Sequence, residues 1–367
     1  MKPGRKRTSS LLRSLLPLVV GICLCLVQTA AVGADAKPYI KVFNDDVFAG
    51  GWFGNSSANC STTDPNYQAP TFNPLQNQFE GGILGFATNN RHGSSVDFGA
   101  FAMGLIQGNP DNQYGFYSGQ GTGTNGLSFS NTGSGISLDY WGGYLAGAAP
   151  QIHCIPDYFG TKQSLNPAPT PLSNSFNVGT LAQDQYLAPN GLTSDVSAGG
   201  TATIPVGTST TVFVNGNVYI SHNIVYAAGY TSDNVPKFAL VVKGNIYIDP
   251  SVTQLDGLYI AQPSTGNIDG DIWTCHDSSN TTPDGYWIGA NCGNKLTFNG
   301  AVIAKQVEFL RINGDLANAP DNEGVGSNNM AETINYIPAM VIGGPFFNQL
   351  PSQNPKINSL ISLPPIF

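Results

Sequence analysis

The sequence predicts an all-β fold whose body is a right-handed parallel β-helix or a related solenoid. A seven-residue phrase with glycine at its third position occurs four times between residues 211 and 311. Each copy continues into residues that alternate along the chain, which is the period of a β-strand. No amphipathic helical pattern is evident after residue 36. These observations together favour short strands joined by glycine-marked bends.

The repeated phrase consists of an apolar residue, a polar residue, a glycine and a short apolar strand. Its copies occupy residues 214–220, 242–248, 255–261 and 298–304. Alternation after the glycine places successive side chains on opposite faces of the strand. The residues expected to face inward are Val218, Ile220, Ile246, Ile248, Val302 and Ala304. The residues expected to face outward are Asn217, Lys243 and Asn245.

The spacing of the copies distinguishes parallel stacking from other arrangements. Gly244 and Gly257 are so close in sequence that no crossover helix fits between their strands. Short rungs stacked on one another are then the remaining way to keep the strands parallel. The wider spacings between the other copies imply insertions that project from the stack. The alternative is an antiparallel β-sandwich with glycine-marked hairpins.

Composition divides the chain into successive parts. The last part is apolar but contains six prolines, so it forms neither a long helix nor a central strand. We expect it to cover the open end of the stacked rungs, which would otherwise expose unpaired backbone groups. The predicted parts are a signal peptide at 1–36, a β-rich N-terminal region at 37–154, a Pro/Ser/Asn-rich linker or long loop at 155–200, the solenoid at 201–334 and a C-terminal capping segment at 335–367.

The N-terminus has the features of an export signal. Five basic residues occur among the first 13, and residues 15–33 carry no charge. Ala34, Asp35 and Ala36 then supply a cleavage site of the A-x-A type. We expect cleavage after Ala36 and a secreted or cell-surface protein. An uncleaved N-terminal membrane anchor is the alternative, because the apolar stretch is just long enough to span a bilayer.

The charge balance excludes one class of partner. Without residues 1–36 the chain has ten Lys and Arg against 22 Asp and Glu, a net charge of −12. No basic patch is available to neutralise phosphates, so nucleic acid is not an expected partner. Only 10% of all residues are charged and 41% are hydrophobic, which argues against disorder. This composition fits an ordered extracellular β-protein with a polar surface.

The cysteines predict disulfides. Beyond the signal peptide the chain has four cysteines, an even number in an exported protein. Cys275 and Cys292 flank a single insertion, and we expect them to pair. Cys60 and Cys154 would then join the ends of the N-terminal region. A zinc site is the alternative, since His153 and His276 each neighbour a cysteine, although no C-x-x-C spacing occurs.

One short segment is a candidate calcium site. Asn267, Asp269 and Asp271 place three oxygen-bearing side chains at alternate positions. The segment departs from an EF-hand, because it lacks the glycine at loop position six and the glutamate at position twelve. A polar turn is the alternative interpretation, and no cofactor is expected elsewhere.

Two groups of residues bear on activity. Aspartates at the rung edges could pair to cleave a sugar bond, although each lies beside Gly or Pro, where Asp is common in turns. Tyrosines at corresponding rung positions could bind glycans or a partner surface, or they could form a structural stack. The aspartates are Asp249, Asp256, Asp269 and Asp271, and the tyrosines are Tyr219, Tyr247 and Tyr259.

Several phrases resemble a group of uncharacterised secreted proteins of small-genome, host-attached bacteria. These phrases are Val-x-Gly-Asn-Val/Ile-Tyr-Ile, Leu-Asp-Gly-Leu-Tyr-Ile-Ala at 255–261, residues 299–311, residues 46–51 and residues 156–159. The C-terminal half also resembles accessory β-solenoid domains of pilus-assembly and surface proteins, but a pilin leader is missing. The resemblance implies a surface location and a β-helical body, and it supplies no catalytic residues.

The sequence therefore predicts a structural or adhesive surface protein rather than an enzyme. No nucleophile elbow, P-loop or dinucleotide-binding fingerprint is present. Glycans or the surface of a host or partner cell are the expected partners. The alternatives are a carbohydrate-active β-helix enzyme, a lyase or a glycosidase, and a pilus-associated accessory protein.

Overall fold

The structure is a computed structural model that divides into two compact units, Met1–Ala36 and Lys37–Phe367. Only the second unit is described below. Counting Ala36, the residues that the structure describes are 36–37, 39–45, 47–49, 52–53, 72–73, 78–79, 85, 93–97, 99–102, 117–118, 127–130, 154–155, 157–160, 168–173, 175–181, 184–194, 200–231, 233–264, 269–276, 292–315 and 330–337.

The described residues form an all-β structure, as predicted. The single described helix is a 3-10 turn, η3, at Val178–Thr180, and no α-helix occurs in this part of the chain. None of the described helices is long and apolar enough to cross a membrane. Strands and the turns between them therefore make up the architecture.

The largest sheet contains twelve of the described strands, and all of its pairings are parallel. Ten strands follow one path, while β16 (Thr201–Ile204) pairs with β19 (Asn223–Tyr226), which also pairs with β22. The path runs β12 (Thr170–Pro171), β14 (Asp184–Ala188), β17 (Ser209–Asn215), β20 (Lys237–Lys243), β22 (Gln254–Gln262), β24 (Leu296–Ala304), β27 (Glu332–Asn335), β2 (Ile40–Phe43), β7 (Ser95–Val96) and β9 (Tyr117–Ser118).

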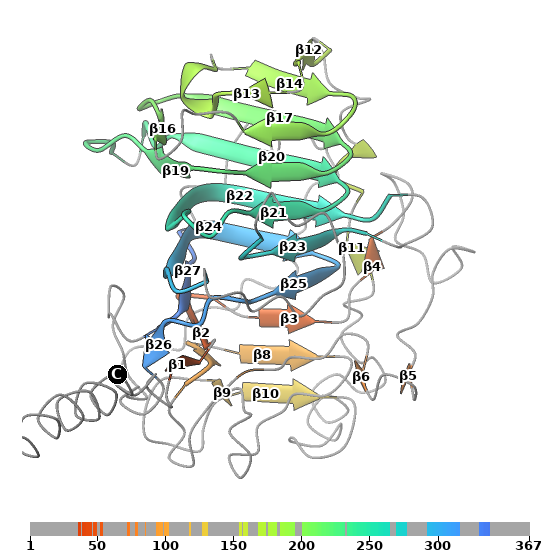
Figure 1. Cartoon of the computed structure of the whole chain (residues 1–367), viewed down its shortest axis with the longest axis vertical. Coiled ribbons are helices and arrows are strands. Elements are labelled where there is room, and N and C mark those ends of the chain that lie inside the picture. Colours follow the sequence, from red (N-terminus) through yellow and green to blue (C-terminus); the bar gives the residue numbers. More distant parts are fainter. Residues whose placement is uncertain are drawn as a thin grey trace, which may run out of the picture. The chain divides into compact units, whose positions relative to one another are not determined.

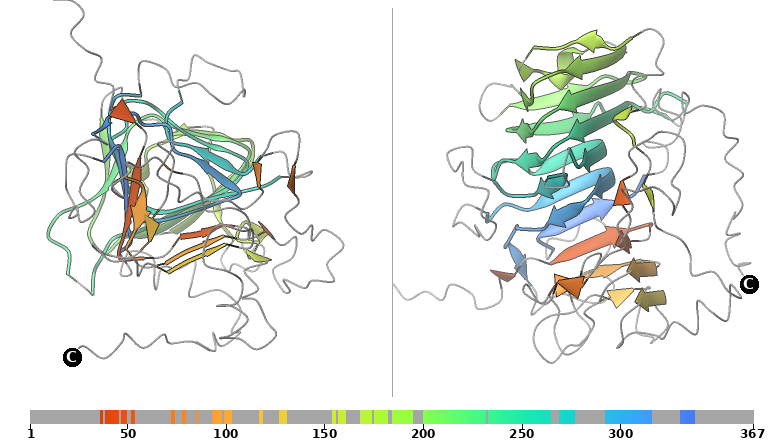
Figure 2. Two further views of the ribbon diagram at one scale, coloured as in Figure 1. Left: turned by 90° about the horizontal axis from the view of Figure 1, so that it is seen from below. Right: turned by 90° about the vertical axis from the view of Figure 1, so that its right-hand side faces the viewer.

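A second sheet lies alongside, with six strands in chain order and parallel pairings throughout. Figures 1 and 2 show the strands of both sheets stacked one above another. The antiparallel sandwich is therefore wrong for both large sheets. The six strands are β13 (Ser175–Phe176), β15 (Leu192–Ser194), β18 (Val218–Ile220), β21 (Ile246–Ile248), β23 (Asp271–Trp273) and β25 (Gln306–Glu308).

The remaining strands are short. One parallel sheet contains three of them, one parallel pair joins β4 to β11, and β5 and β6 form an antiparallel pair. Their bounds are β3 (Val47–Ala49), β8 (Gly99–Ala102) and β10 (Leu127–Ser130), then β4 (Trp52–Phe53) and β11 (Cys154–Ile155), β5 (Phe72–Asn73) and β6 (Gln78–Phe79), and finally β1 (Ala36–Lys37) and β26 (Gly314–Asp315).

The predicted alternation of side chains is confirmed. Val218, Ile220, Ile246 and Ile248 are fully buried in one hydrophobic core cluster, against which the partly buried Val302 and Ala304 also pack. Of the residues expected to face outward, Asn217 is exposed, whereas Lys243 and Asn245 are half-buried. In β18 and β21 the alternation thus separates an apolar core from a more polar outer face.

The two longest strands each belong to two columns of strands. Before Gly257, β22 pairs with β19 through Leu255; after it, β22 pairs with β20 through Leu258 and the residues that follow. Gly257 and Gly300 face each other in the β22–β24 pairing and have φ values of 122° and 144°, which side-chain-bearing residues rarely adopt. Each long strand therefore bends at its glycine from one column into the next.

The four copies of the phrase are not equivalent, which corrects the sequence analysis. Gly216 and Gly244 lie at one bend, where the next glycine in register is Gly270, because Ile246 pairs with Ile272. Gly257 and Gly300 lie at the other bend. The two bends have the same signature because both require positive φ and leave no room for a Cβ. Gly244 and Gly257 therefore mark successive bends and do not stack.

Regular structure begins before residue 201. Within the predicted linker or loop at 155–200, β12, β13, β14 and β15 already pair within the two large sheets. The segment 157–160 also packs against the outer face of β17, β20 and β22. There the buried Phe159 meets Phe213 edge-on, with ring centroids 6.3 Å apart. Prolines are tolerated at β12 because it is an edge strand.

The two ends of the described chain meet in the largest sheet. Strand β2 pairs with β27 on one side and with β7 on the other. The edge of β27 is therefore covered by the N-terminal region. Residues 338–367, to which most of the predicted cap belongs, lie outside the described residues, and that assignment stays a prediction.

Candidate functional site: an aromatic and acidic sheet face

The outer face of the six-stranded sheet presents a ladder of aromatic side chains. Tyr219 of β18 pairs with Tyr247 of β21, Tyr247 pairs with Trp273 of β23, and Trp273 pairs with Glu308 of β25. All four side chains are half-buried, while the neighbours of the three aromatic residues in sequence are buried. Neighbouring strands are about 4.8 Å apart, so the three aromatic residues occupy successive positions across the sheet, and this column is called the platform below.

Specific contacts hold the two tyrosines. The ring of Tyr247 packs against the ring of His276, with centroids 4.4 Å apart, and its hydroxyl accepts a hydrogen bond from Asn245 at 3.0 Å. The hydroxyl of Tyr219 donates to the Asp249 carboxylate. The buried indole N–H of Trp273, in contrast, has no hydrogen-bond partner among the described residues. Trp273 is thus the ring of the ladder whose polar group is buried without a hydrogen bond.

The third predicted tyrosine is not part of this ladder. Tyr259 is fully buried in the core, where its ring packs between Phe238 and Phe298 at centroid distances of 6.0 and 5.9 Å. The third position of the ladder is occupied by Trp273 instead of Tyr259. The reason is that Gly270, and not Gly257, follows Gly216 and Gly244 in register at the same bend. The signal was present in the sequence as Gly-Asp-Ile-Trp, which repeats the Gly-Asn-apolar-aromatic order with Asp for Asn.

Two carboxylates on neighbouring strands adjoin Trp273. Asp271 pairs with Gln306 across β23 and β25, and Glu308 lies two residues beyond Gln306. Burial raises the pKa of Asp271, and Lys305 opposes this shift. Burial also raises the pKa of Glu308, and the negative charge of Asp271 adds to the increase. One oxygen of Asp271 is buried without a hydrogen-bond partner. Perturbed carboxylates beside aromatic rings are typical of ligand sites.

Two of the other predicted aspartates, Asp249 and Asp269, accept hydrogen bonds within turns. Asp249 accepts hydrogen bonds from the backbone N–H and hydroxyl of Ser251 at 2.8 and 2.6 Å. Asp269 does the same for Ser264, at 2.6 Å in both cases. These are turn contacts, as the alternative interpretation of the aspartates expected.

Asp256 also has a structural role, at the other bend. It is buried and accepts from the backbone N–H of Tyr226 at 2.7 Å, from Gln254 at 2.9 Å and from Asn299 at 2.8 Å. Of the predicted aspartates, Asp271 therefore lies in the outward column beside the rings, and Asp249 reaches this face through the Tyr219 hydroxyl. The neighbouring carboxylate of Asp271 there is Glu308, which the sequence analysis missed.

The structure does not bring the three candidate calcium ligands together among the described residues. Asn267 lies outside the described residues, and the Asp269 carboxylate is engaged by Ser264. In the part of the chain that the structure describes, no three His, Cys, Asp or Glu side chains are grouped so that they could hold a metal ion. Of the histidines weighed for zinc, His276 packs on Tyr247, and His153 lies outside the described residues.

Asparagines fix the spacing of the strands beneath the platform. The side-chain oxygen of Asn217 accepts from the backbone N–H of Asn245 at 2.9 Å. The side-chain oxygen of Asn245 accepts from the backbone N–H groups of Gly270 and Asp271 at 2.8 and 2.9 Å. Each asparagine thus ties its own bend to the next one in the stack.

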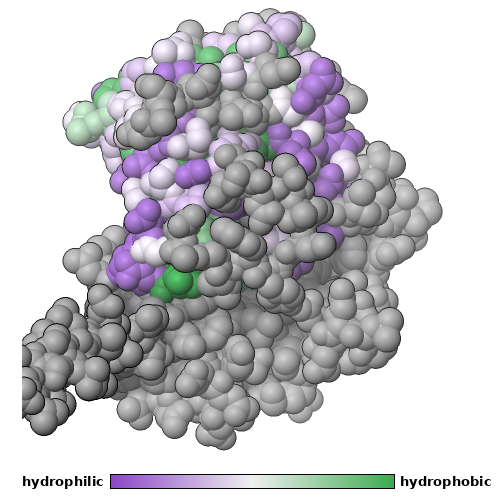
Figure 3. Space-filling view, viewed as in Figure 1, coloured by the Kyte–Doolittle hydropathy of each residue, from purple (hydrophilic) through white to green (hydrophobic). Residues whose placement is uncertain are grey.

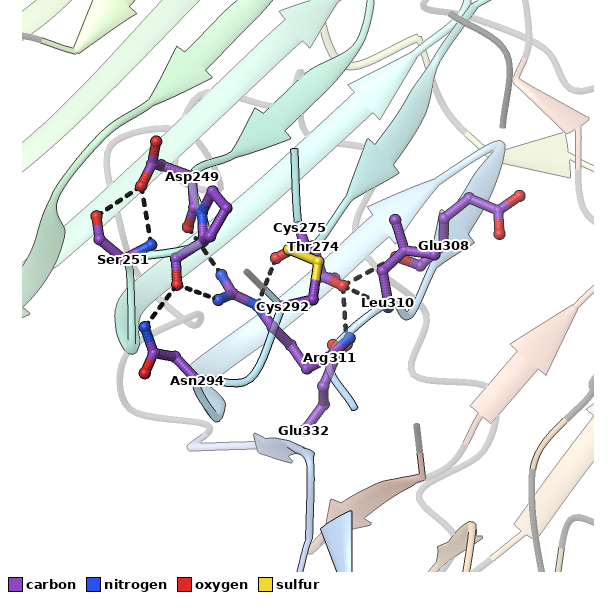
Figure 4. The surroundings of a disulfide bond; sticks show 11 residues. Asp249, Ser251, Thr274, Cys275, Cys292, Asn294, Glu308, Leu310, Arg311 and Glu332 are labelled. Carbon is purple, nitrogen blue, oxygen red and sulfur yellow. Dashed lines mark hydrogen bonds between the residues drawn. A yellow bond between two sulfur atoms is a disulfide. The ribbon is translucent and has the colours of Figure 1, made fainter. Parts of the chain in front are cut away.

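A disulfide lies where β23 ends. Cys275 and Cys292 are bonded, with Cα atoms 5.9 Å apart, and both are buried (Figure 4). Cys60 lies outside the described residues, so its pairing with Cys154 stays a prediction. The disulfide joins the base of the insertion 276–291 to the start of the segment that leads into β24.

A buried arginine binds the ends of β21 and β23 from inside the stack. The guanidinium of Arg311 donates to the backbone carbonyls of Asp249 at 2.9 Å, Pro250 at 2.5 Å and Thr274 at 2.7 Å (Figure 4). Its backbone N–H donates to the Glu332 carboxylate at 2.8 Å. The strands that carry Tyr247 and Trp273 are therefore held at a fixed separation.

The surrounding surface is polar. In the space-filling view the described residues are mainly hydrophilic, with small scattered hydrophobic patches (Figure 3). The large exposed hydrophobic side chains among the described residues are Val206 and Tyr230. Comparison with protein-family models, with curated proteins and with solved structures gives no match.

Proposed function

We propose that this chain is a secreted or cell-surface β-solenoid with a structural or adhesive role, and that the outer face of β18, β21, β23 and β25 binds glycan chains. The observation that carries the proposal is the Tyr219–Tyr247–Trp273 ladder. Its rings run across three strands, so a linear ligand could contact all of them at once.

The solenoid is supported by the columns of parallel strands. Strands β18, β21 and β23 form one column, β17 and β20 a second, and β16 and β19 a third. The chain visits the columns in turn, and β22 and β24 each span two of them. A coil that returns to the same column after each turn is the connection that a right-handed parallel β-helix needs.

Glycan binding is supported by the chemistry of the face. Sugar rings have apolar faces that stack on aromatic rings, and their hydroxyls need hydrogen-bond donors and acceptors around the edge. Asn217, Asn245, Asp271 and Gln306 form the next outward column beside the rings. The predicted export signal and the low content of charged residues support an extracellular location.

The expected result of removing the platform is a loss of glycan binding. An aromatic contact contributes about 0.5–1.5 kcal/mol beyond its buried area, so Trp273→Ala should weaken binding roughly tenfold. The measurement is a glycan-array screen of the purified protein, followed by titration of any ligand found. Tyr230→Ala is the matched control, because Tyr230 is 37% exposed and lies outside the ladder.

Two outcomes would contradict glycan binding. One is the absence of any array ligand for protein recovered from outside the cell. The other is an equal loss of affinity in the Trp273→Ala and Tyr230→Ala variants. Cell fractionation tests the location separately, since a protein found only in the cytoplasm would refute it.

The acidic pair favours a second candidate function, hydrolysis of the bound glycan. One protonated carboxyl group would give its proton to the glycosidic oxygen as the C–O bond breaks. The other, ionised, would take a proton from the water that attacks the anomeric carbon. Asp271 and Glu308 both have raised pKa values beside Trp273. Hydrolysis therefore needs no residue beyond those of the platform and its edge.

Activity on polysaccharides distinguishes the two functions. If the pair is catalytic, Asp271→Asn and Glu308→Gln should each abolish the release of reducing ends while binding persists. Asp233→Asn, at an exposed aspartate away from the platform, is the control. Binding without turnover by the unaltered protein would leave adhesion as the function.

A further inference from the structure

Strand β2 lies in a slot of the largest sheet, between β27 on one side and β7 on the other. Strand β2 is the first strand that lies wholly in the second unit, yet it occupies the inside of the largest sheet. Ile40 pairs with Glu332 of β27, and Lys41 pairs both with Thr333 of β27 and with Ser95 of β7. Strand β2 thus fills a gap between strands from distant parts of the chain.

Main-chain hydrogen bonds hold β2 on both edges. The carbonyl of Tyr39 accepts from the backbone N–H of Glu332 at 3.2 Å, and that of Phe43 accepts from Tyr336 at 3.1 Å. On the other edge, the carbonyl of Val42 accepts from the backbone N–H of Asp97 at 3.0 Å. Contacts of this kind recognise any extended segment in the correct register, as in β-strand addition.

Side chains on both faces of β2 are buried, which gives the slot its specificity. Tyr39 and Phe43 pack with Met330 in one cluster. Ile40 and Val42 pack with Val96 in another. From Tyr39 to Phe43 no residue is more than 5% exposed. An empty slot would expose these apolar surfaces and two unpaired strand edges, which natural proteins avoid.

Everything that the slot recognises is contained in Tyr39–Phe43, so a second copy of the chain can supply it equally well. During synthesis β2 emerges well before β27, so it has no β27 partner of its own until residue 335 has been made. In that interval it can enter the finished slot of a neighbouring molecule. Exchange of an identical element between copies adds no new contacts and needs no new surface.

We propose that the slot between β7 and β27 is a strand-acceptor site whose partner is the N-terminal strand of a second copy of this chain. Reciprocal exchange produces a closed dimer, and exchange in one direction produces a chain of molecules. Either product links copies of the platform, which increases avidity for a repetitive ligand. The assembly does not depend on glycan binding.

Cysteine cross-linking in the full-length chain tests the exchange. Lys41 and Thr333 are directly paired, so one protein carries Lys41→Cys and a second carries Thr333→Cys. The two are unfolded together, refolded as a mixture and oxidised. We expect a disulfide between residues 41 and 333 of different molecules, identified by peptide mass spectrometry, with a yield that rises with protein concentration.

Two controls make the outcome decisive. A single chain with both substitutions should cross-link internally at high dilution, which shows that the pair has suitable geometry. A mixture of Ser209→Cys and Lys237→Cys proteins tests a pair within the body, β17 with β20, and should give no dimer. The proposal is overturned if the 41/333 mixture gives no dimer although the double variant cross-links, or if both mixtures give dimers equally.

Discussion

Replacing Glu332 with Gln should stabilise the protein at pH 8 and have little effect at pH 5. Glu332 lies in β27 on the core side of the sheet, since Leu296 and Ile40 flank it in register and are buried. Burial raises its pKa from 4.5 to about 7. Only one of its carboxylate oxygens is bonded, to the backbone N–H of Arg311 and the Thr274 hydroxyl, each at 2.8 Å.

The direction of the pH dependence follows from proton binding. Between pH 4.5 and about 7 the folded protein holds a proton on Glu332 that the unfolded chain has mostly released. Folding stability therefore falls as the pH rises through this range and is constant above it. The difference of the two pKa values corresponds to about 3 kcal/mol. The amide introduced by Glu332→Gln carries no charge at any pH, so the advantage of this variant grows between pH 4.5 and about 7 and is fully present above pH 7.

Urea unfolding at pH 5 and pH 8 measures this effect. We expect Glu332→Gln to raise the free energy of unfolding by about 2–3 kcal/mol at pH 8 and by much less at pH 5. Glu308→Gln is the comparison, because Glu308 is half-buried with a pKa raised in the same direction. Its effect should have the same sign and be smaller. Equal free energies for Glu332→Gln and the unaltered protein at pH 8 would contradict the prediction.

Gly300→Ala should cause the largest loss of stability among the glycine substitutions. A Cβ at this position would lie 2.0 Å from the carbonyl oxygen of Gly257, which is backbone and cannot rotate away. The φ of 144° adds strain for any L-residue with a side chain. Strain and overpacking together imply a loss of about 3 kcal/mol or more.

Substitutions at two other glycines distinguish backbone strain from the steric clash as the cause of that loss. Gly229 has a φ of 86° but nothing within 4 Å of its Cβ position, so Gly229→Ala should cost about 1 kcal/mol from strain alone. Gly293 has open space and no positive φ, so Gly293→Ala should be nearly neutral. Thermal unfolding of the three variants should rank them in this order. Similar melting temperatures for Gly300→Ala and Gly229→Ala would show that the bend can relax.

The fold class and the facing of side chains could be predicted because they depend on local pattern. Alternation in 218–220 and 246–248 specifies which side chains are buried, and the short spacing without a helix favoured the parallel strands that the structure has. The Cys275–Cys292 pair was likewise predicted from two cysteines that flank one insertion. The candidate site was predicted only in part, since Tyr219, Tyr247 and Asp271 belong to the face whereas Trp273 and Glu308 were missed.

By itself the sequence determined that this is a β-protein with glycine bends, because a period of two and a missing Cβ are properties of local sequence. The structure then decided between the predicted parallel strands and the antiparallel alternative. Only the tertiary structure decided which bend each glycine forms, because Gly244 and Gly257 have the same local requirement for positive φ. It also placed β2 beside β27 and buried Glu332 near Arg311. Strands β2 and β27 come from opposite ends of the described chain, and Glu332 lies 21 residues beyond Arg311. Neither contact is recorded in a local pattern, because each depends on how many residues lie between the segments that meet.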